Sequence, residues 1–252
     1  MNAPTIALQL YTVRDFAEKD LAATLSQVKE MGYDAVELAG TYGLEITAFK
    51  KLLDEAGLTA ISAHVPIEGF DDIGKPDIAD YKALGCKVIS IPWLSMDALP
   101  GGSGYDKTKA TLIRAYEACK KEGIILAYHN HDFEFKTMPC GSTILDVLLD
   151  EGTFLQAQLD TGWITAAGLA PVSYIKKYQG RCPSVHLKDI VKVNGKFEDR
   201  PVGDGMQDIP AVIEAALEAG AFILVAELDE AVGMTSLEAA WQSRKYLKSI
   251  GY

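Results

Sequence analysis

The sequence predicts a (β/α)8 barrel, and three observations lead to this fold class. Eight short apolar runs alternate with eight helix-like stretches, and alternating β and α elements favour a parallel sheet. A glycine closes five helix-like stretches just before the next apolar run: Gly32, Gly57, Gly85, Gly123 and Gly220. A chain of 252 residues has the usual size of a closed barrel of eight such units.

The first four units are predicted from apolar runs, helix caps and glycines. We expect strands over residues 6–10, 35–38, 58–65 and 88–91. We expect helices over 21–31, 47–56, 77–84 and 106–122, each with apolar residues at helical spacing.

The second four units follow the same pattern. We expect strands over residues 124–129, 155–159, 184–187 and 222–226, and helices over 143–150, 171–178, 208–219 and 235–250. An open doubly wound sheet is the alternative, but it normally carries a G-x-G-x-x-G turn after the first strand, and residues 9–14 contain no glycine. No linker or change of composition divides the chain, so we expect one domain over residues 1–252.

Composition narrows the class of partner. The net charge of −11 argues against a nucleic-acid backbone or an anionic membrane as the main partner. The four cysteines are far apart and form no CxxC pair, which indicates free thiols in a reducing compartment. Residues 1–252 contain no recognisable signal peptide or membrane span, so a cytoplasmic location is expected.

One segment concentrates polar chemistry. The apolar run 124–127 leads directly into Tyr-His-Asn-His-Asp-Phe-Glu-Phe over residues 128–135. Such a change is typical of a buried strand that ends in a polar site, although a strand end that meets solvent gives the same pattern.

Polar side chains also follow the other predicted strands, and active sites of these barrels lie at the carboxyl ends of the strands. All four histidines of the chain belong to this set, which is difficult to explain by structural roles alone. The set consists of Gln9, Glu37, His64, His129, His131, Glu134, Asp160, His186 and Glu227.

The last four strands suggest a metal site. They end in Glu134, Asp160, His186 and Glu227, and consecutive strands of a barrel are neighbours. Three carboxylates so close together would repel one another without a cation. An oxygen-rich set with one imidazole suits a divalent ion such as Mn²⁺, Mg²⁺, Fe²⁺ or Co²⁺.

At these residues the chain resembles the sugar phosphate isomerase/epimerase superfamily, which has the xylose isomerase-like (β/α)8 TIM barrel. Its members include tagatose and psicose 3-epimerases, inosose dehydratases and endonuclease IV. The resemblance covers the whole chain, and its best markers are residues 8–14, 129–134, 159–162 and 186–189. It implies that Glu134, Asp160, His186 and Glu227 bind one divalent ion, with Mn²⁺ as first choice and Mg²⁺, Co²⁺, Fe²⁺ or Zn²⁺ as alternatives. It also implies that Glu134 and Glu227 act as catalytic acid and base.

The activity that the resemblance implies is isomerisation or epimerisation of a keto-sugar through a cis-enediolate. The candidates for substrate contact are His64, His131, Trp163 and Lys188. The expected partner is a small carbohydrate, with no nucleic acid and no membrane, and a homo-oligomer stays open.

Other functions stay open as well. Trp163 stands where the epimerases often have a histidine, which leaves room for an inosose or a 3-keto-glycoside and makes a lyase or dehydratase the main alternative. A non-catalytic sugar-binding barrel is the alternative of another class. Endonuclease activity is disfavoured, because it uses a histidine-rich site and this acidic chain has only four histidines. Residues 202–205 follow the seventh strand, where many barrels bind phosphate, but a simple turn is the preferred interpretation.

Overall fold

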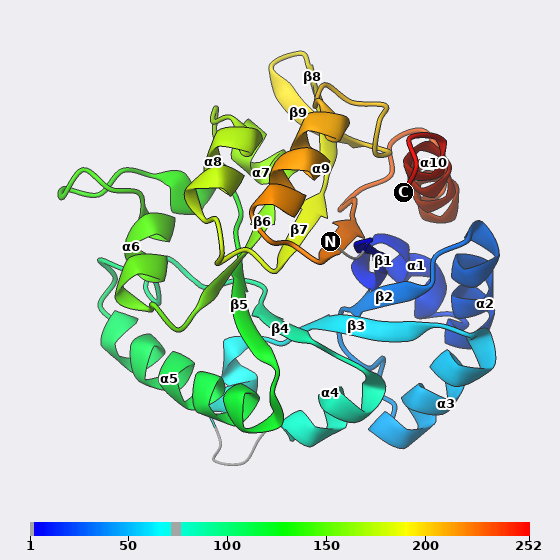
Figure 1. Cartoon of the computed structure of the whole chain (residues 1–252), viewed down its shortest axis with the longest axis horizontal. Coiled ribbons are helices and arrows are strands. Elements are labelled where there is room, and N and C mark those ends of the chain that lie inside the picture. Colours follow the sequence, from blue (N-terminus) through cyan, green and yellow to red (C-terminus); the bar gives the residue numbers. More distant parts are fainter. Residues whose placement is uncertain (1–2, 72–76) are drawn as a thin grey trace.

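The computed structural model describes residues 3–71 and 77–252, and it confirms the predicted barrel (Figure 1). Eight parallel strands close in the order β1-β10-β7-β6-β5-β4-β3-β2. The strands are β1 (Thr5–Gln9), β2 (Ala35–Leu38), β3 (Thr59–His64), β4 (Val88–Ile91), β5 (Ile125–His129), β6 (Gln156–Asp160), β7 (Ser184–Leu187) and β10 (Ile223–Ala226).

Helices surround this barrel and follow the strands in sequence. The helices are α1 (Arg14–Ala17), α2 (Leu21–Met31), α3 (Ile46–Ala56), α4 (Ile78–Leu84), α5 (Tyr105–Glu122), α6 (Ile144–Glu151), α7 (Thr161–Ala166), α8 (Pro171–Lys177), α9 (Ile209–Glu218) and α10 (Ser236–Ser249). Asp20, Asp77 and Thr235 accept hydrogen bonds at the N-termini of α2, α4 and α10, which fixes where these helices begin. Among the described helices none is long and apolar enough to cross a membrane.

A hairpin after the seventh barrel strand was not predicted. Strands β8 (Asp189–Val193) and β9 (Lys196–Arg200) pair antiparallel and project from the edge of the barrel (Figure 1). Asn194 and Gly195 form the turn, both with positive φ. An Asn-Gly pair between two strands is a strong hairpin signal, so this hairpin could have been predicted from the sequence.

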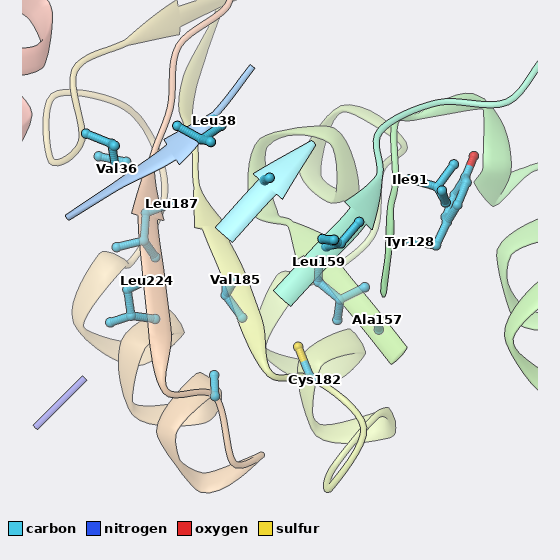
Figure 2. Packing of buried hydrophobic residues seen from close by; sticks show 14 of the residues in the cluster. Val36, Leu38, Ile91, Tyr128, Ala157, Leu159, Cys182, Val185, Leu187 and Leu224 are labelled. Atoms are coloured by element: carbon cyan, nitrogen blue, oxygen red, sulfur yellow. The ribbon is translucent and has the colours of Figure 1, made fainter. Parts of the chain in front are cut away.

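The apolar residues form two separate cores. Along each barrel strand, successive side chains point to opposite faces. The outer core lies between strands and helices, and Figure 2 shows some of its members, including Leu159, Val185, Leu187 and Leu224. The inner core lies inside the barrel and consists of small and branched side chains: Ala7, Ala35, Val88, Ala127, Ile223 and Val225.

Above the inner core, the interior of the barrel becomes polar. Gln158 of β6 donates a hydrogen bond to Glu37 of β2, 2.7 Å away, although these strands are not neighbours in the sheet. The contact therefore crosses the barrel interior. One or two residues further along the strands, the side chains are those of the candidate site.

A buried carboxylate joins α6 to α8 and gives a first prediction. Asp146 accepts hydrogen bonds from the hydroxyls of Tyr174 and Tyr178 at 2.7 and 2.6 Å, and pairs with Lys177 at 2.7 Å. Burial alone would raise the pKa of Asp146, but the donors around it, Lys177 first, lower it to about 2.

Asp146→Asn is expected to lower the free energy of unfolding by about 1–3 kcal/mol at pH 7, measured by urea denaturation. Because the pKa is lower in the folded protein, the stabilisation is complete above the ordinary value of 3.8 and disappears as the pH falls toward 2. The difference between wild type and variant should therefore shrink in acid. Asp150→Asn, an exposed change on the same helix, is the control, and an equal effect there would contradict the prediction.

Candidate functional site

A cavity of about 570 Å³ opens at the carboxyl ends of the barrel strands. Of the predicted site residues, His64, His131 and Glu227 line it directly, together with His129. These four residues follow or end β3, β5 and β10, so the cavity lies where active sites occur in such barrels.

Four buried donors meet at the floor of this cavity. They are His129, Asp160, His186 and Glu227, and one ligand atom from each lies within 4.8 Å of all the others. They lie in, or directly follow, the neighbouring strands β5, β6, β7 and β10. Three of the four residues predicted as metal ligands are thus brought together, with His129 as the fourth donor.

Glu134, the remaining predicted ligand, is not a member of this group. It lies beyond the end of β5 in the short 3-10 helix Phe133–Phe135. Its carboxylate accepts hydrogen bonds from the Tyr128 hydroxyl at 2.7 Å and from the backbone N–H of His131 at 2.9 Å. Burial raises the pKa of Glu134 to about 7, against the lowering effect of the Tyr128 hydrogen bond.

Glu37 is a central residue of the site. It was predicted to lie at a strand end, but it was not among the predicted metal ligands, catalytic residues or substrate contacts. Its carboxylate accepts hydrogen bonds from Gln9, Ser62 and Gln158 at 2.6–2.7 Å. The Nε2 atoms of His64 and His186 lie 3.0 and 2.7 Å from its Oε1. The only sign in the sequence was a glutamate within an otherwise apolar strand.

A bulge helps to arrange the partners of Glu37. Val36 pairs with Ala60 and Glu37 with Ser62, so Ile61 is an extra residue in β3. After this bulge Ser62 faces Glu37 across the two strands. β-Bulges often change the direction in which side chains point beside functional sites.

Histidines and carboxylates shift the pKa values of one another inside the barrel. Burial alone would raise the pKa of Glu37, but the imidazoles of His64 and His186 outweigh it and hold the pKa well below its usual range. Burial alone would lower the pKa of His186, but Glu37 and Glu227 raise it to about 10. His186 Nδ1 is 2.8 Å from Glu227 Oε2, so this imidazole lies between two carboxylates.

Lys188 brings a second cation to the donor group. Its fully buried ammonium lies 2.7 Å from Asp229, 3.4 Å from Glu227 and 3.5 Å from Asp160. Burial alone would lower the pKa of Lys188, but these carboxylates raise it. The lysine is therefore charged.

The two carboxylates of the donor group, Asp160 and Glu227, have pKa values that are shifted in opposite directions. Burial raises the pKa of Asp160 to about 7, despite the nearby Lys188. Burial would also raise the pKa of Glu227, but Lys188 and His186 lower it well below its usual range. Glu227 is therefore an anion at neutral pH.

The donor group suits a divalent metal ion. Asp160 Oδ2 and His129 Nδ1 are buried and have no hydrogen-bond partner among the described residues. Four carboxylates, Glu37, Asp160, Glu227 and Asp229, gather here around Lys188 and His186. His186 would bind a metal ion as a neutral imidazole, after it has lost its proton. Two imidazoles and two carboxylates are ligands that Mn²⁺, Fe²⁺, Co²⁺ and Zn²⁺ accept.

The other predicted contact residues lie around this group. The His64 ring is 4.9 Å from that of His129, measured between ring centroids, and burial lowers the pKa of His131 to about 4. The backbone N–H of Trp163 donates to Asp160 Oδ1 at 2.9 Å. The Trp163 ring lies beside Lys188, with 4.8 Å from Nζ to the ring centroid.

The turn over residues 202–205 binds an internal carboxylate. The backbone N–H groups of Gly203 and Gly205 both donate to Asp189 Oδ2 at 3.0 Å. A side chain at Gly205 would collide with the Asp189 carboxylate, since a Cβ there would lie 2.0 Å from Oδ1. These amides are occupied, which supports the interpretation of this segment as a turn.

Comparisons with known proteins agree with this architecture. The inosose dehydratase of Clostridium botulinum is 22% identical over 92% of this chain and 90% of its own length. The structure of a sugar phosphate isomerase/epimerase from Parabacteroides distasonis aligns with a TM-score of 0.82 at 24% identity, covering 100% of this chain and 96% of that one. An L-ribulose 3-epimerase structure aligns with a TM-score of 0.68 at 16% identity, covering 98% of this chain and 94% of the other.

The family is established by a match over most of the chain. The sequence model of the xylose isomerase-like TIM barrel family matches residues 25–250. This range contains all four donors of the cavity floor and seven of the eight barrel strands. The chain therefore belongs to the xylose isomerase-like TIM barrel family.

Proposed function

We propose that this protein is a divalent-metal-dependent sugar isomerase or epimerase, with residues 1–252 acting as one catalytic domain. The observation that carries the proposal is the buried group of His129, Asp160, His186 and Glu227 at the floor of an open cavity. A keto-sugar is the proposed substrate, as in the relatives named as epimerases.

These four residues would hold the metal ion. When bound, a divalent ion supplies a positive charge that polarises a carbonyl and makes the neighbouring C–H more acidic. Mn²⁺ is our first choice, since the mixed nitrogen and oxygen donors do not favour Mg²⁺.

Glu227 is the proposed base for the first proton transfer. Its carboxylate is ionised and lines the cavity, so it can accept a proton from a carbon next to the carbonyl. The electron pair of the broken C–H bond moves to the carbonyl oxygen, which gives a cis-enediolate. The Lys188 ammonium, 3.4 Å from Glu227, stabilises the ionised form of this carboxylate.

Glu134 is the proposed group for the second proton transfer. A carboxyl group with a pKa of about 7 can both donate and accept a proton near neutral pH. Glu134 Oε1 lies 4.0 Å from His131 Nδ1, and His131 lines the cavity. A small shift that brings these two atoms to hydrogen-bond distance would let the imidazole carry the proton between Glu134 and the substrate. Return of a proton to the same carbon gives an epimer, and return to the neighbouring carbon gives an isomer.

Dehydration is the second candidate function. Inosose dehydratases match this chain over 92% of its length, and the same enediolate can expel a hydroxyl group β to the carbonyl. Glu134, acting through His131, would then protonate the leaving hydroxyl, and water would be released.

Deuterium exchange tests the proposed function. The protein is incubated in D₂O with Mn²⁺ and a panel of keto-sugars and inososes, and mass spectrometry measures the deuterium gained at carbon. The expected result is metal-dependent wash-in for at least one compound, with an epimer or isomer as product, and its loss on addition of EDTA. A dehydrated product would select the second candidate. No wash-in with any compound and any of the divalent ions would indicate a non-catalytic sugar-binding barrel.

A further inference from the structure

The cavity has two chemically different halves. The inner half contains the titratable side chains of His64, His129, His131, Glu227 and Asp229. The outer half is uncharged and is formed by the ends of β1, β2, β3 and β4. Its lining residues are Tyr11, Ala39, Gly40, Pro66, Pro92 and Trp93.

Two aromatic side chains of the outer half are exposed. Trp93 is 51% exposed and Tyr11 is 43% exposed, although both are large and apolar. Trp93 stands between Pro92 and the buried Leu94, which limits the movement of its backbone. Exposed aromatic rings at the mouth of a polar cavity present flat surfaces on which a ring-shaped ligand can stack.

The Tyr11 ring is held in place. The guanidinium of Arg14 covers one of its faces, 3.8 Å from the ring centroid. The backbone N–H of Tyr11 donates to the Gln9 side chain at 3.0 Å. A ring fixed in this way loses little freedom when a ligand stacks on it, which favours binding.

The cations around the cavity are already engaged. Among the described residues that line it, none is a lysine or an arginine. Lys188 is surrounded by Asp160, Glu227 and Asp229. Arg14 donates to the backbone carbonyls of Tyr11 and Asp229 at 2.8 and 3.0 Å. A phosphate group on the part of the ligand away from the donor group would therefore meet no free lysine or arginine to bind it.

We infer that the site takes an uncharged glycoside, whose second ring stacks on Trp93 and Tyr11 while the sugar that reacts occupies the inner half. This inference rests on the proposed function, which places the reacting sugar above the donor group. The volume of about 570 Å³ falls in the range of cavities that enclose ligands larger than a single small ring. The second ring is either another sugar or an aromatic aglycone, since both present a flat apolar face.

Calorimetric titration tests the inference with four probes: methyl β-D-glucoside, phenyl β-D-glucoside, cellobiose and glucose 6-phosphate. The two pyranosides and cellobiose are closed at the reacting ring, so the measurement reports binding alone. Stacking is expected to make phenyl glucoside or cellobiose bind about 2- to 10-fold tighter than methyl glucoside. Whichever binds tighter identifies the second ring. Glucose 6-phosphate should bind more weakly than all three.

Variants of Trp93 test whether the preference for glycosides with a second ring comes from the outer half of the cavity. Trp93→Ala should bring the affinities for the three glycosides together, and Trp93→Phe should keep most of the difference. Trp241→Ala is the matched control, because Trp241 is 48% exposed on α10 and does not line the cavity. Equal affinities in the wild type, tighter binding of glucose 6-phosphate, no binding of any probe, or an unchanged preference in Trp93→Ala would overturn the inference.

The two proposals fail separately. The deuterium exchange assay uses free keto-sugars, which have no second ring. Exchange without a preference for the larger glycosides refutes the second-ring site and leaves the proposed function standing. A preference without exchange refutes the proposed chemistry and leaves the stacking surface.

Discussion

Glu227→Gln is expected to reduce deuterium wash-in from D₂O by about 100- to 10,000-fold, the usual contribution of one acid–base group. The amide cannot accept the proton from carbon. It also removes the negative charge that His186 Nδ1 and Lys188 face at 2.8 and 3.4 Å. The assay is exchange at carbon, measured at saturating Mn²⁺ so that weaker metal binding does not limit the rate.

Measuring sugar affinity shows whether Glu227→Gln impairs the proton transfer alone or also the binding of the sugar. Glu227→Gln should still bind the keto-sugar that exchanges in the wild type, with an affinity within about 10-fold of wild type, because a single hydrogen bond contributes about 0.5–1.5 kcal/mol. Glu218→Gln, on the outer helix α9 and paired with Lys176 at 3.3 Å, should exchange at the wild-type rate. Full exchange in Glu227→Gln would rule out this residue as the base.

Glu37→Gln is expected to have the largest effect on stability, about 3–5 kcal/mol of unfolding free energy, since it leaves a buried histidine without its counter-charge. The amide can accept at one atom only, and its NH₂ group would face donors from Gln158 and Ser62 or the imidazole of His186. Because Glu37 also orients His186, affinity for Mn²⁺ should fall about 10- to 100-fold.

The stabilisation that Glu37 and His186 provide depends on pH in opposite directions. The pKa of Glu37 is lower in the folded protein, so its stabilisation is present above 4.5 and disappears in acid. The pKa of His186 is raised, so its stabilisation is complete below 6.5 and disappears as the pH rises toward 10. The difference in unfolding free energy between wild type and Glu37→Gln should therefore be largest between about pH 5 and 6.5.

An exposed glutamate provides the control for this experiment. Glu55→Gln on α3 should change the unfolding free energy by less than about 0.5 kcal/mol. Urea denaturation over a range of pH measures both variants. A Glu37→Gln protein as stable as wild type at pH 6 would show that the interior polar network does not depend on this charge.

The barrel could be predicted because each of its parts leaves a local signal. Gly32, Gly57 and Gly123 end helices with positive φ, which only glycine adopts easily, and each is followed closely by a strand. The hairpin β8–β9 was missed because its strands are rich in charges, although Asn194-Gly195 marked its turn.

The candidate site could be predicted only in part. Asp160 and His186 end or lie within strands whose direction is fixed by the barrel, and both reach the donor group. After His129 the chain leaves the sheet and forms a 3-10 helix, so strand alternation no longer says where Glu134 points. The role of Glu37 depends on contacts across the barrel with Gln158 and His186, which the sequence alone does not reveal.

The central claim is that one divalent cation binds between His129, Asp160, His186 and Glu227. Crystals grown with Mn²⁺, measured at the manganese absorption edge, test it most directly. One strong anomalous peak is expected within ligand distance of side chains from this group, and the peak should be lost in the His186→Ala variant. A map with no peak there, or with Mn²⁺ bound only at surface carboxylates, would contradict it.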